Sequence, residues 1–155
     1  MEFCDYSAAK NNIETEIERL VEWQYISEKQ AEAIDCDAIS AFFESRAYEL
    51  IKNAREVYKE YRFLTDVNCH ELNENIPDTS GEYSLVQGVA DCVAVLHDSI
   101  AIIDYKTDSA TDEGYYISEY SHQLKMYADA ISKIFGMPVT TKIIYSFKMK
   151  KCIEL

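Results

Sequence analysis

The sequence has no closely spaced cysteine pair, no long apolar run and no signal-peptide pattern at its start. Its five cysteines are odd in number and widely separated, at Cys4, Cys36, Cys69, Cys92 and Cys152. Such spacing argues for reduced thiols, and against a disulfide framework, a zinc site or an iron–sulfur cluster. A membrane span needs about eighteen consecutive apolar residues, which the chain does not contain. We therefore expect a cytoplasmic protein that makes no membrane contact.

Basic residues are also scarce. Lysine and arginine number 15 against 28 aspartates and glutamates, which gives a net charge of −13. A protein that binds nucleic acid by itself usually carries a basic patch, because phosphate neutralisation supplies most non-specific affinity. If this chain acts on nucleic acid, either its basic residues gather on one face or another part of a larger assembly holds the strand.

A chain of 155 residues with 48% apolar residues is large enough for one domain with a proper core. We assign residues 1–155 to a single domain, with a helical part at 1–55 and a core at 56–155. The sequence contains no internal repeat and no low-complexity tract that would suggest a different organisation.

Helical spacing of apolar residues is clearest in the first part. It predicts an amphipathic helix over 13–21 and a long, buried helix over 39–54. Between them, Ser27 and Gln30 form a capping-box pattern, which predicts a short helix that ends near Ile34.

The second part predicts four strands and one helix. The elements are a strand at 57–67, a polar loop at 68–83, two strands within 85–108 joined by a turn at His97–Ser99, a helix from about Ile117 to Ile134 and a strand at 139–147. Gly136, with Pro138 beyond it, is expected to end the helix, and the basic segment 148–155 is expected to end the fold or fray. Helices, three strands, a helix and a strand predict an α/β (α+β) fold.

Three ionisable residues interrupt the apolar stretch 85–108: Asp91, Asp104 and Lys106. A buried carboxylate without a partner is costly, so these residues need an explanation. One explanation is a structural salt bridge to Lys106. The other is a metal site, because two carboxylates brought together by the hairpin are hard oxygen ligands that suit Mg²⁺ or Mn²⁺. Asp104 and Lys106 share one face of their strand, and Tyr105 turns to the other.

The ordered set of motifs resembles the RecB-like branch of the PD-(D/E)XK nucleases. It comprises Gly88-x-x-Asp91, Asp104-Tyr105-Lys106 and Gln123-x-x-x-Tyr127. More narrowly, DYKTD followed by QLxxY is similar to the C-terminal nuclease domain of the A subunit of AddAB-type ATP-dependent helicase–nucleases. This resemblance implies the αβββαβ restriction-endonuclease-like core, a mixed sheet flanked by helices, with extra helices at the N-terminus.

The resemblance also implies residue roles. Asp91, Asp104 and the backbone carbonyl of Tyr105 are expected to bind one or two Mg²⁺ or Mn²⁺ ions. Lys106 is expected to orient water or stabilise transition-state charge, and Gln123 with Tyr127 to position the substrate. The implied activity is a metal-dependent DNA exonuclease for double-strand break processing and recombinational repair. The implied partners are DNA, the remainder of the polypeptide and a B-type subunit.

One departure from the family is the absence of a metal-binding histidine in a GTxxH setting. His70, His97 and His122 all have a different context. We expect that the chain is an excised fragment that is only weakly active alone, or that Glu60 or water replaces the histidine. Glu60 also has a simpler interpretation, as an exposed strand residue or a partner of Arg62. Two other functions remain open: a catalytically silent docking module and a stand-alone RecB-like nuclease.

Overall fold

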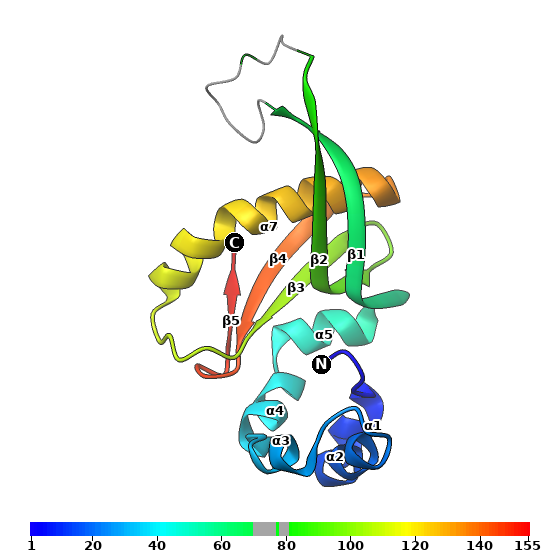
Figure 1. Ribbon diagram of the computed structural model, residues 1–155, viewed down its shortest axis with the longest axis vertical. Coiled ribbons are helices and arrows are strands. Elements are labelled where there is room, and N and C mark those ends of the chain that lie inside the picture. Colours follow the sequence, from blue (N-terminus) through cyan, green and yellow to red (C-terminus); the bar gives the residue numbers. More distant parts are fainter. Residues whose placement is uncertain (70–76, 78–80) are drawn as a thin grey trace.

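The computed structural model describes residues 1–69, 77 and 81–155, and within them the chain forms one mixed five-stranded sheet with helices on both faces (Figure 1). The strands are β1 (Glu56–Asn68), β2 (Tyr83–Val95), β3 (Ile100–Lys106), β4 (Val139–Ser146) and β5 (Lys151–Glu154), in the order β1-β2-β3-β4-β5. Only β3 and β4 pair in parallel, and the other neighbours are antiparallel. The predicted α/β fold with a mixed sheet is therefore confirmed.

Five short helices precede the sheet and gather at its lower end in Figure 1. They are α1 (Tyr6–Asn11), α2 (Ile13–Glu22), α3 (Glu28–Glu32), α4 (Cys36–Phe43) and α5 (Arg46–Asn53). The capping box at Ser27 is confirmed, because Ser27 and Gln30 each bind the other's backbone N–H. Helix α1 was not predicted from the sequence.

The predicted single long helix over 39–54 is wrong. Helix α4 ends at Phe43, and α5 begins only at Arg46. The break lies at Ser45, whose backbone is extended and whose side chain accepts a hydrogen bond from Tyr48 N at 3.3 Å. Serine competes for backbone groups in this way and therefore favours helix starts over helix interiors.

Strands β1 and β2 form a long hairpin that extends beyond the rest of the molecule (Figure 1). The predicted polar loop at 68–83, and His70 within it, lies mostly outside the described residues. Its described ends are part of the ladder instead, since Asn68 pairs with Tyr83. The predicted turn between β2 and β3 is confirmed by a hydrogen bond from Leu96 N to Ser99 O of 2.8 Å.

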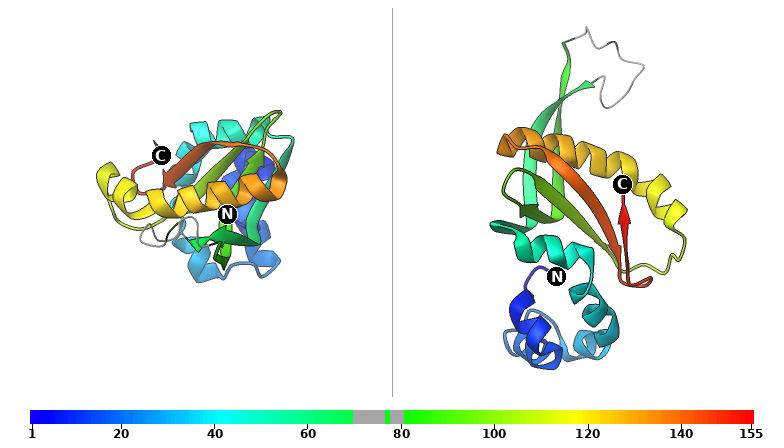
Figure 2. Two further views of the ribbon diagram at one scale, coloured as in Figure 1. Left: turned by 90° about the horizontal axis from the view of Figure 1, so that it is seen from above. Right: turned by 180° about the vertical axis from the view of Figure 1, so that it is seen from behind.

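Helix α7 (Glu113–Phe135) crosses one face of the sheet (Figure 2). It ends as predicted at Gly136, which has the left-handed φ of 62° that glycine tolerates. It begins earlier than predicted, because the Asp112 side chain accepts from Tyr115 N and caps it. Helical spacing in the sequence predicts a core-facing stripe on this helix, formed by Ile117, Tyr120, Leu124, Tyr127, Ala128, Ile131 and Ile134. The middle of the stripe is buried, but Ile117 and Ile134 at its ends are exposed.

For the segment after β4, two outcomes were predicted, and the structure shows the first: it completes the fold. Residues 151–154 form β5, which pairs antiparallel with the end of β4 instead of fraying. Among the described residues, no helix is both long enough and apolar enough to cross a membrane.

Side chains that alternate along the strands divide the core in two. Ile102 and Val93 pack with α7, whereas Ile103 and Cys92 pack with residues of α1, α4 and α5 on the opposite face. Both faces of β3 are therefore buried, which explains its nearly continuous apolar run. A polar group on β3 consequently lies inside the protein.

Gly88 is where the hairpin meets α7, and we predict that Gly88→Ala destabilises the fold. A methyl group there would overlap the ring of buried Phe63 and lie 3.0 Å from Tyr127 Cε1. Overpacking of this kind costs about 1–3 kcal/mol of unfolding free energy. Gly114→Ala, in the first turn of α7, is the matched control and should change the unfolding free energy by less than about 1 kcal/mol. Chemical denaturation measures both, and equal values would contradict the prediction.

Candidate active site

The β2–β3 hairpin brings Asp91 and Asp104 side by side, as predicted. The ladder between β2 and β3 ends at the pair Cys92 and Ile103, so the two aspartates occupy the next opposing positions. There the Asp91 carboxylate, rather than a backbone carbonyl, accepts the Tyr105 N–H at 2.8 Å. The two strands therefore stop pairing where the two acids meet.

Asp104 is buried, with 8% of its surface exposed, and forms an ion pair with Lys106. Burial raises the pKa of the Asp104 carboxyl, although the neighbouring Lys106 ammonium acts to lower it. Burial acts to lower the pKa of Lys106, but the Asp104 carboxylate outweighs it and the pKa is raised. Lys106 therefore stays positively charged at neutral pH.

The Asp104 carboxylate has spare capacity for a ligand. Its Oδ2 is paired with Lys106 Nζ at 2.7 Å, and a carboxylate has two oxygens that together can accept several contacts. The single contact with Lys106 therefore does not saturate the Asp104 carboxylate. Together with the Asp91 carboxylate it offers the hard oxygen atoms that Mg²⁺ and Mn²⁺ prefer, so the residues present fit such an ion.

The protein provides few side chains for this ion. Among residues 1–69, 77 and 81–155, no three histidine, cysteine, aspartate or glutamate side chains are grouped so that they could hold a metal. A cation bound by Asp91 and Asp104 would thus keep positions for backbone oxygen, water or substrate. Open positions are typical of Mg²⁺ sites that act on phosphates.

Lys106 is held from a second side by Tyr120 of α7. Its Nζ lies 4.1 Å from the centre of the Tyr120 ring, a cation–π contact. Sequence reasoning placed Tyr120 in the core stripe and missed this contact. Its position three residues before Gln123, on the same face of the helix, was the available signal.

Gln123 and Tyr127 are neighbours on α7, as predicted. Gln123 Nε2 donates to the Tyr127 hydroxyl at 3.0 Å, and the Tyr127 ring packs edge-on against Phe63 with centroids 5.0 Å apart. Tyr127 also lies against Gly88, the first residue of the Gly88-x-x-Asp91 motif. The pair thus adjoins the motif glycine, and its role in substrate positioning stays a prediction.

Glu60 lies in the position of β1 that faces Asp91, between the paired residues Lys59 and Tyr61. Its φ of 49° is left-handed, a strained conformation for a non-glycine residue, and such strain is concentrated at functional sites. The pKa of the Glu60 carboxyl is raised, mainly by burial and secondly by the negative charge of Asp91. The interpretation of Glu60 as a simply exposed strand residue is therefore wrong.

The described histidines lie elsewhere. His97 is exposed in the β2–β3 turn and pairs with Asp98 at 2.6 Å. His122 lines a cavity of about 370 Å³ between α7 and the β1–β2 hairpin. Neither replaces the histidine that the family motif would supply.

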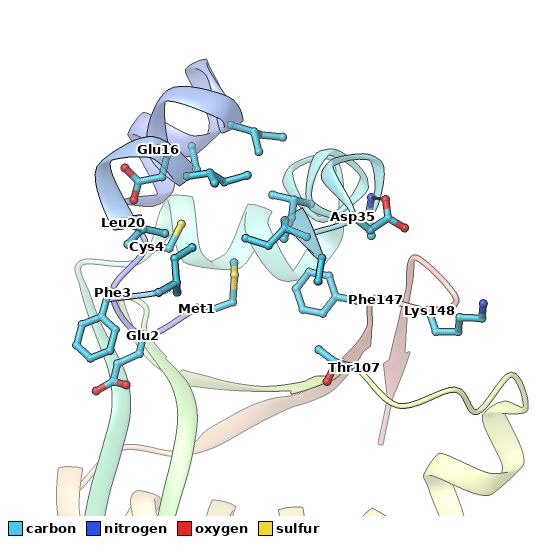
Figure 3. A pocket seen from close by; sticks show the side chains of 18 of the residues that line it. Met1, Glu2, Phe3, Cys4, Glu16, Leu20, Asp35, Thr107, Phe147 and Lys148 are labelled. Atoms are coloured by element: carbon cyan, nitrogen blue, oxygen red, sulfur yellow. Dashed lines mark hydrogen bonds between the residues drawn. The ribbon is translucent and has the colours of Figure 1, made fainter. Parts of the chain in front are cut away.

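A larger cavity, of about 690 Å³, lies between the N-terminal helices and the ends of β3 and β4 (Figure 3). Thr107 and Phe147 border it at one end, and Glu16 and Leu20 at the other. Glu60 also lines it, so it reaches the vicinity of the two aspartates. Its walls are mostly apolar, which does not suit a cation.

The loop that follows Lys106 is pinned to the sheet. The Tyr116 hydroxyl donates to Asp108 Oδ1 at 2.6 Å and lies 3.2 Å from Ser146 Oγ. Tyr116 is fully buried and is a core residue, whereas Tyr115 is 43% exposed. The position of Tyr115 and Tyr116 just past Lys106 predicts that they either stack on bases or pack against the core, and Tyr116 packs.

Comparison with known proteins agrees with this geometry. Residues 5–151 match the family described as the PD-(D/E)XK nuclease superfamily. The chain is also similar to curated proteins named as the A subunit of an ATP-dependent helicase/nuclease. The protein from Geobacillus thermodenitrificans is 36% identical over 147 residues, which cover 89% of this chain. The protein from Clostridium acetobutylicum is 31% identical over 155 residues, which cover 98% of it. The chain spans only 12% of the length of either relative.

A solved structure, "Crystal structure of SSO0001", aligns with 90% of this chain and 59% of its own, at 18% sequence identity. The TM-score of this alignment is 0.44, which is too low to support the family assignment. The family match covers nearly the whole chain and includes Asp91, Asp104 and Lys106. This chain belongs to the PD-(D/E)XK nuclease superfamily.

Proposed function

We propose that the chain is a Mg²⁺- or Mn²⁺-dependent deoxyribonuclease domain that hydrolyses phosphodiester bonds. The observation that carries this proposal is the pair of neighbouring carboxylates, Asp91 and buried Asp104, with the charged Lys106 beside them. A purely structural ion pair would match one buried acid with one base. Here, within the described residues, two neighbouring acids share one lysine, so a divalent cation would balance the remaining negative charge.

Each residue has a separate role in this proposal. Asp91, Asp104 and the Tyr105 carbonyl would hold the ion, which when bound polarises the scissile phosphate and lowers the pKa of water. Lys106 stabilises negative charge on the phosphate or orients the attacking water. Asp104 and Tyr120 hold Lys106 in place from two sides, which limits the geometry its ammonium can adopt. Gln123 and Tyr127 position the strand.

We further propose that the domain works within an ATP-dependent helicase–nuclease. The curated relatives carry that name and are about eight times longer than this chain. Their other regions, with a B-type subunit, would deliver DNA for exonucleolytic processing of double-strand breaks in recombinational repair. With a net charge of −13, the chain repels DNA and should be a weak nuclease alone, most of all at low salt, where screening is least.

The two other functions are less well supported. A silent docking module would have no need for a buried carboxylate oxygen beside a charged lysine, yet both are present. A stand-alone nuclease would need its own DNA affinity, which the acidic charge opposes.

Asp104→Asn should abolish metal binding and cleavage. Wild-type protein should melt at a higher temperature in Mg²⁺, because a ligand that binds only the folded state stabilises it. The Asn variant should show no such shift, whereas Asp129→Asn, an exposed change on α7, should shift normally. Protons compete with the ion for Asp104, whose pKa is raised by burial, so the Mg²⁺ shift should shrink as the pH is lowered. A full shift in Asp104→Asn would refute the site.

Lys106→Met should separate binding from catalysis. The variant keeps both aspartates and should bind Mn²⁺ in calorimetry, yet its cleavage rate should fall at least about 100-fold, as when an oriented charge-stabilising group is lost. Lys125→Met, an exposed change on α7, should cut DNA at the wild-type rate. Normal cleavage by Lys106→Met would leave this lysine with a structural role only.

Gln123→Ala and Leu124→Ala should have opposite effects. Leu124 is buried and its truncation should cost about 2–5 kcal/mol of unfolding free energy. Gln123 is partly exposed, so its loss should lower cleavage while the melting temperature changes little. If both variants lose similar stability, Gln123 belongs to the core and its functional role is wrong.

A further inference from the structure

Tyr105 lies between Asp104 and Lys106 in sequence, but its side chain lies on the opposite face of the sheet. There its hydroxyl is 3.1 Å from the hydroxyl of Tyr6, on helix α1. Its ring meets Phe42 of α4 edge-on, with centroids 5.6 Å apart. Elements that are distant from the site in sequence thus hold this ring.

The backbone of Tyr105 belongs to the site itself. Its N–H is the donor that holds the Asp91 carboxylate, at the point where β2 no longer pairs with β3. Asp104 and Lys106 are bonded to it on either side. A displacement of Tyr105 would therefore move all three of these residues.

Tyr6 is well suited to hold Tyr105 in place. It is buried at 8% exposure, and Lys59 Nζ lies 4.1 Å from the centre of its ring. Lys59 also donates to the carbonyl of Cys4, and the side chain of Asp5 caps helix α1. The backbone on the N-terminal side of Tyr6 is therefore anchored both to β1 and to its own helix.

From these contacts we infer that Tyr6 is a positioning residue of the nuclease site. Its hydroxyl holds Tyr105 from the face of the sheet opposite Asp104 and Lys106, and Tyr105 in turn sets the positions of Asp91, Asp104 and Lys106. The N-terminal helices thereby act on the metal site without contributing a ligand. Outer partners that orient metal ligands typically affect affinity or activity about 10–100-fold. This inference rests on the proposed function.

Tyr6→Phe tests the inference because it removes only the hydroxyl group. Two readouts are needed: Mn²⁺ affinity by calorimetry without DNA, and hydrogen exchange of the Tyr105 amide. We expect about 10-fold weaker Mn²⁺ binding and faster exchange at Tyr105. The double variant with Tyr105→Phe should bind Mn²⁺ no more weakly than the Tyr105→Phe single variant, because the Tyr6–Tyr105 contact is already lost in that single variant.

Tyr48→Phe is the matched control. Tyr48 lies in the same core, at 7% exposure, and its ring is 5.8 Å from that of Phe42. Its hydroxyl makes no hydrogen bond to the part of the chain that the structure describes. This variant should keep wild-type Mn²⁺ affinity and wild-type exchange at Tyr105.

Wild-type Mn²⁺ affinity in Tyr6→Phe would overturn the inference and leave the proposed function intact. Equal weakening in Tyr6→Phe and Tyr48→Phe would also overturn it, since the effect would then come from general loosening of the core. A wild-type protein that binds no Mn²⁺ would contradict the proposed function, and the inference with it.

Discussion

The hydrogen bond from Tyr105 N–H to the Asp91 carboxylate is the contact on which the site depends. It lies where the β2–β3 ladder ends, so a side chain takes the place of a ladder carbonyl. This keeps the two strands close while it places one acid beside another. Asp91 is thereby oriented by the backbone of β3, and the Asp104 carboxylate lies next to it.

This arrangement has an electrostatic cost, because it places the Asp104 carboxylate inside the protein, and the packing of the surrounding fold maintains it. Burial of Asp104 favours its neutral form, and Lys106 compensates only in part. Two apolar cores cover the two faces of the sheet and exclude water from β3. A divalent cation would supply the missing positive charge, which links the stability of this region to the proposed chemistry.

Much of the fold followed from periodicity and end signals in the sequence. The turn at His97–Ser99 and the end of α7 at Gly136 were predicted because polar residues and glycine mark such positions locally. The helix break at Ser45 was missed because helical spacing of apolar residues continues across it, and only the cap shows that the backbone turns. For residues 148–155 the sequence left open whether the segment ends the fold or frays, because the pairing of residues 151–154 with β4 is a tertiary contact.

The sequence by itself determined the candidate site, since alternation along β3 puts Asp104 and Lys106 on one face and an antiparallel hairpin brings Asp91 beside them. Only the tertiary structure decided what surrounds it. Two contacts join different elements of the chain: that of Tyr120 with Lys106, and that of Tyr6 with Tyr105. The strained backbone of Glu60 likewise lies opposite Asp91 of the neighbouring strand. Local patterns cannot specify such contacts, because they depend on how helices pack on the two faces of the sheet.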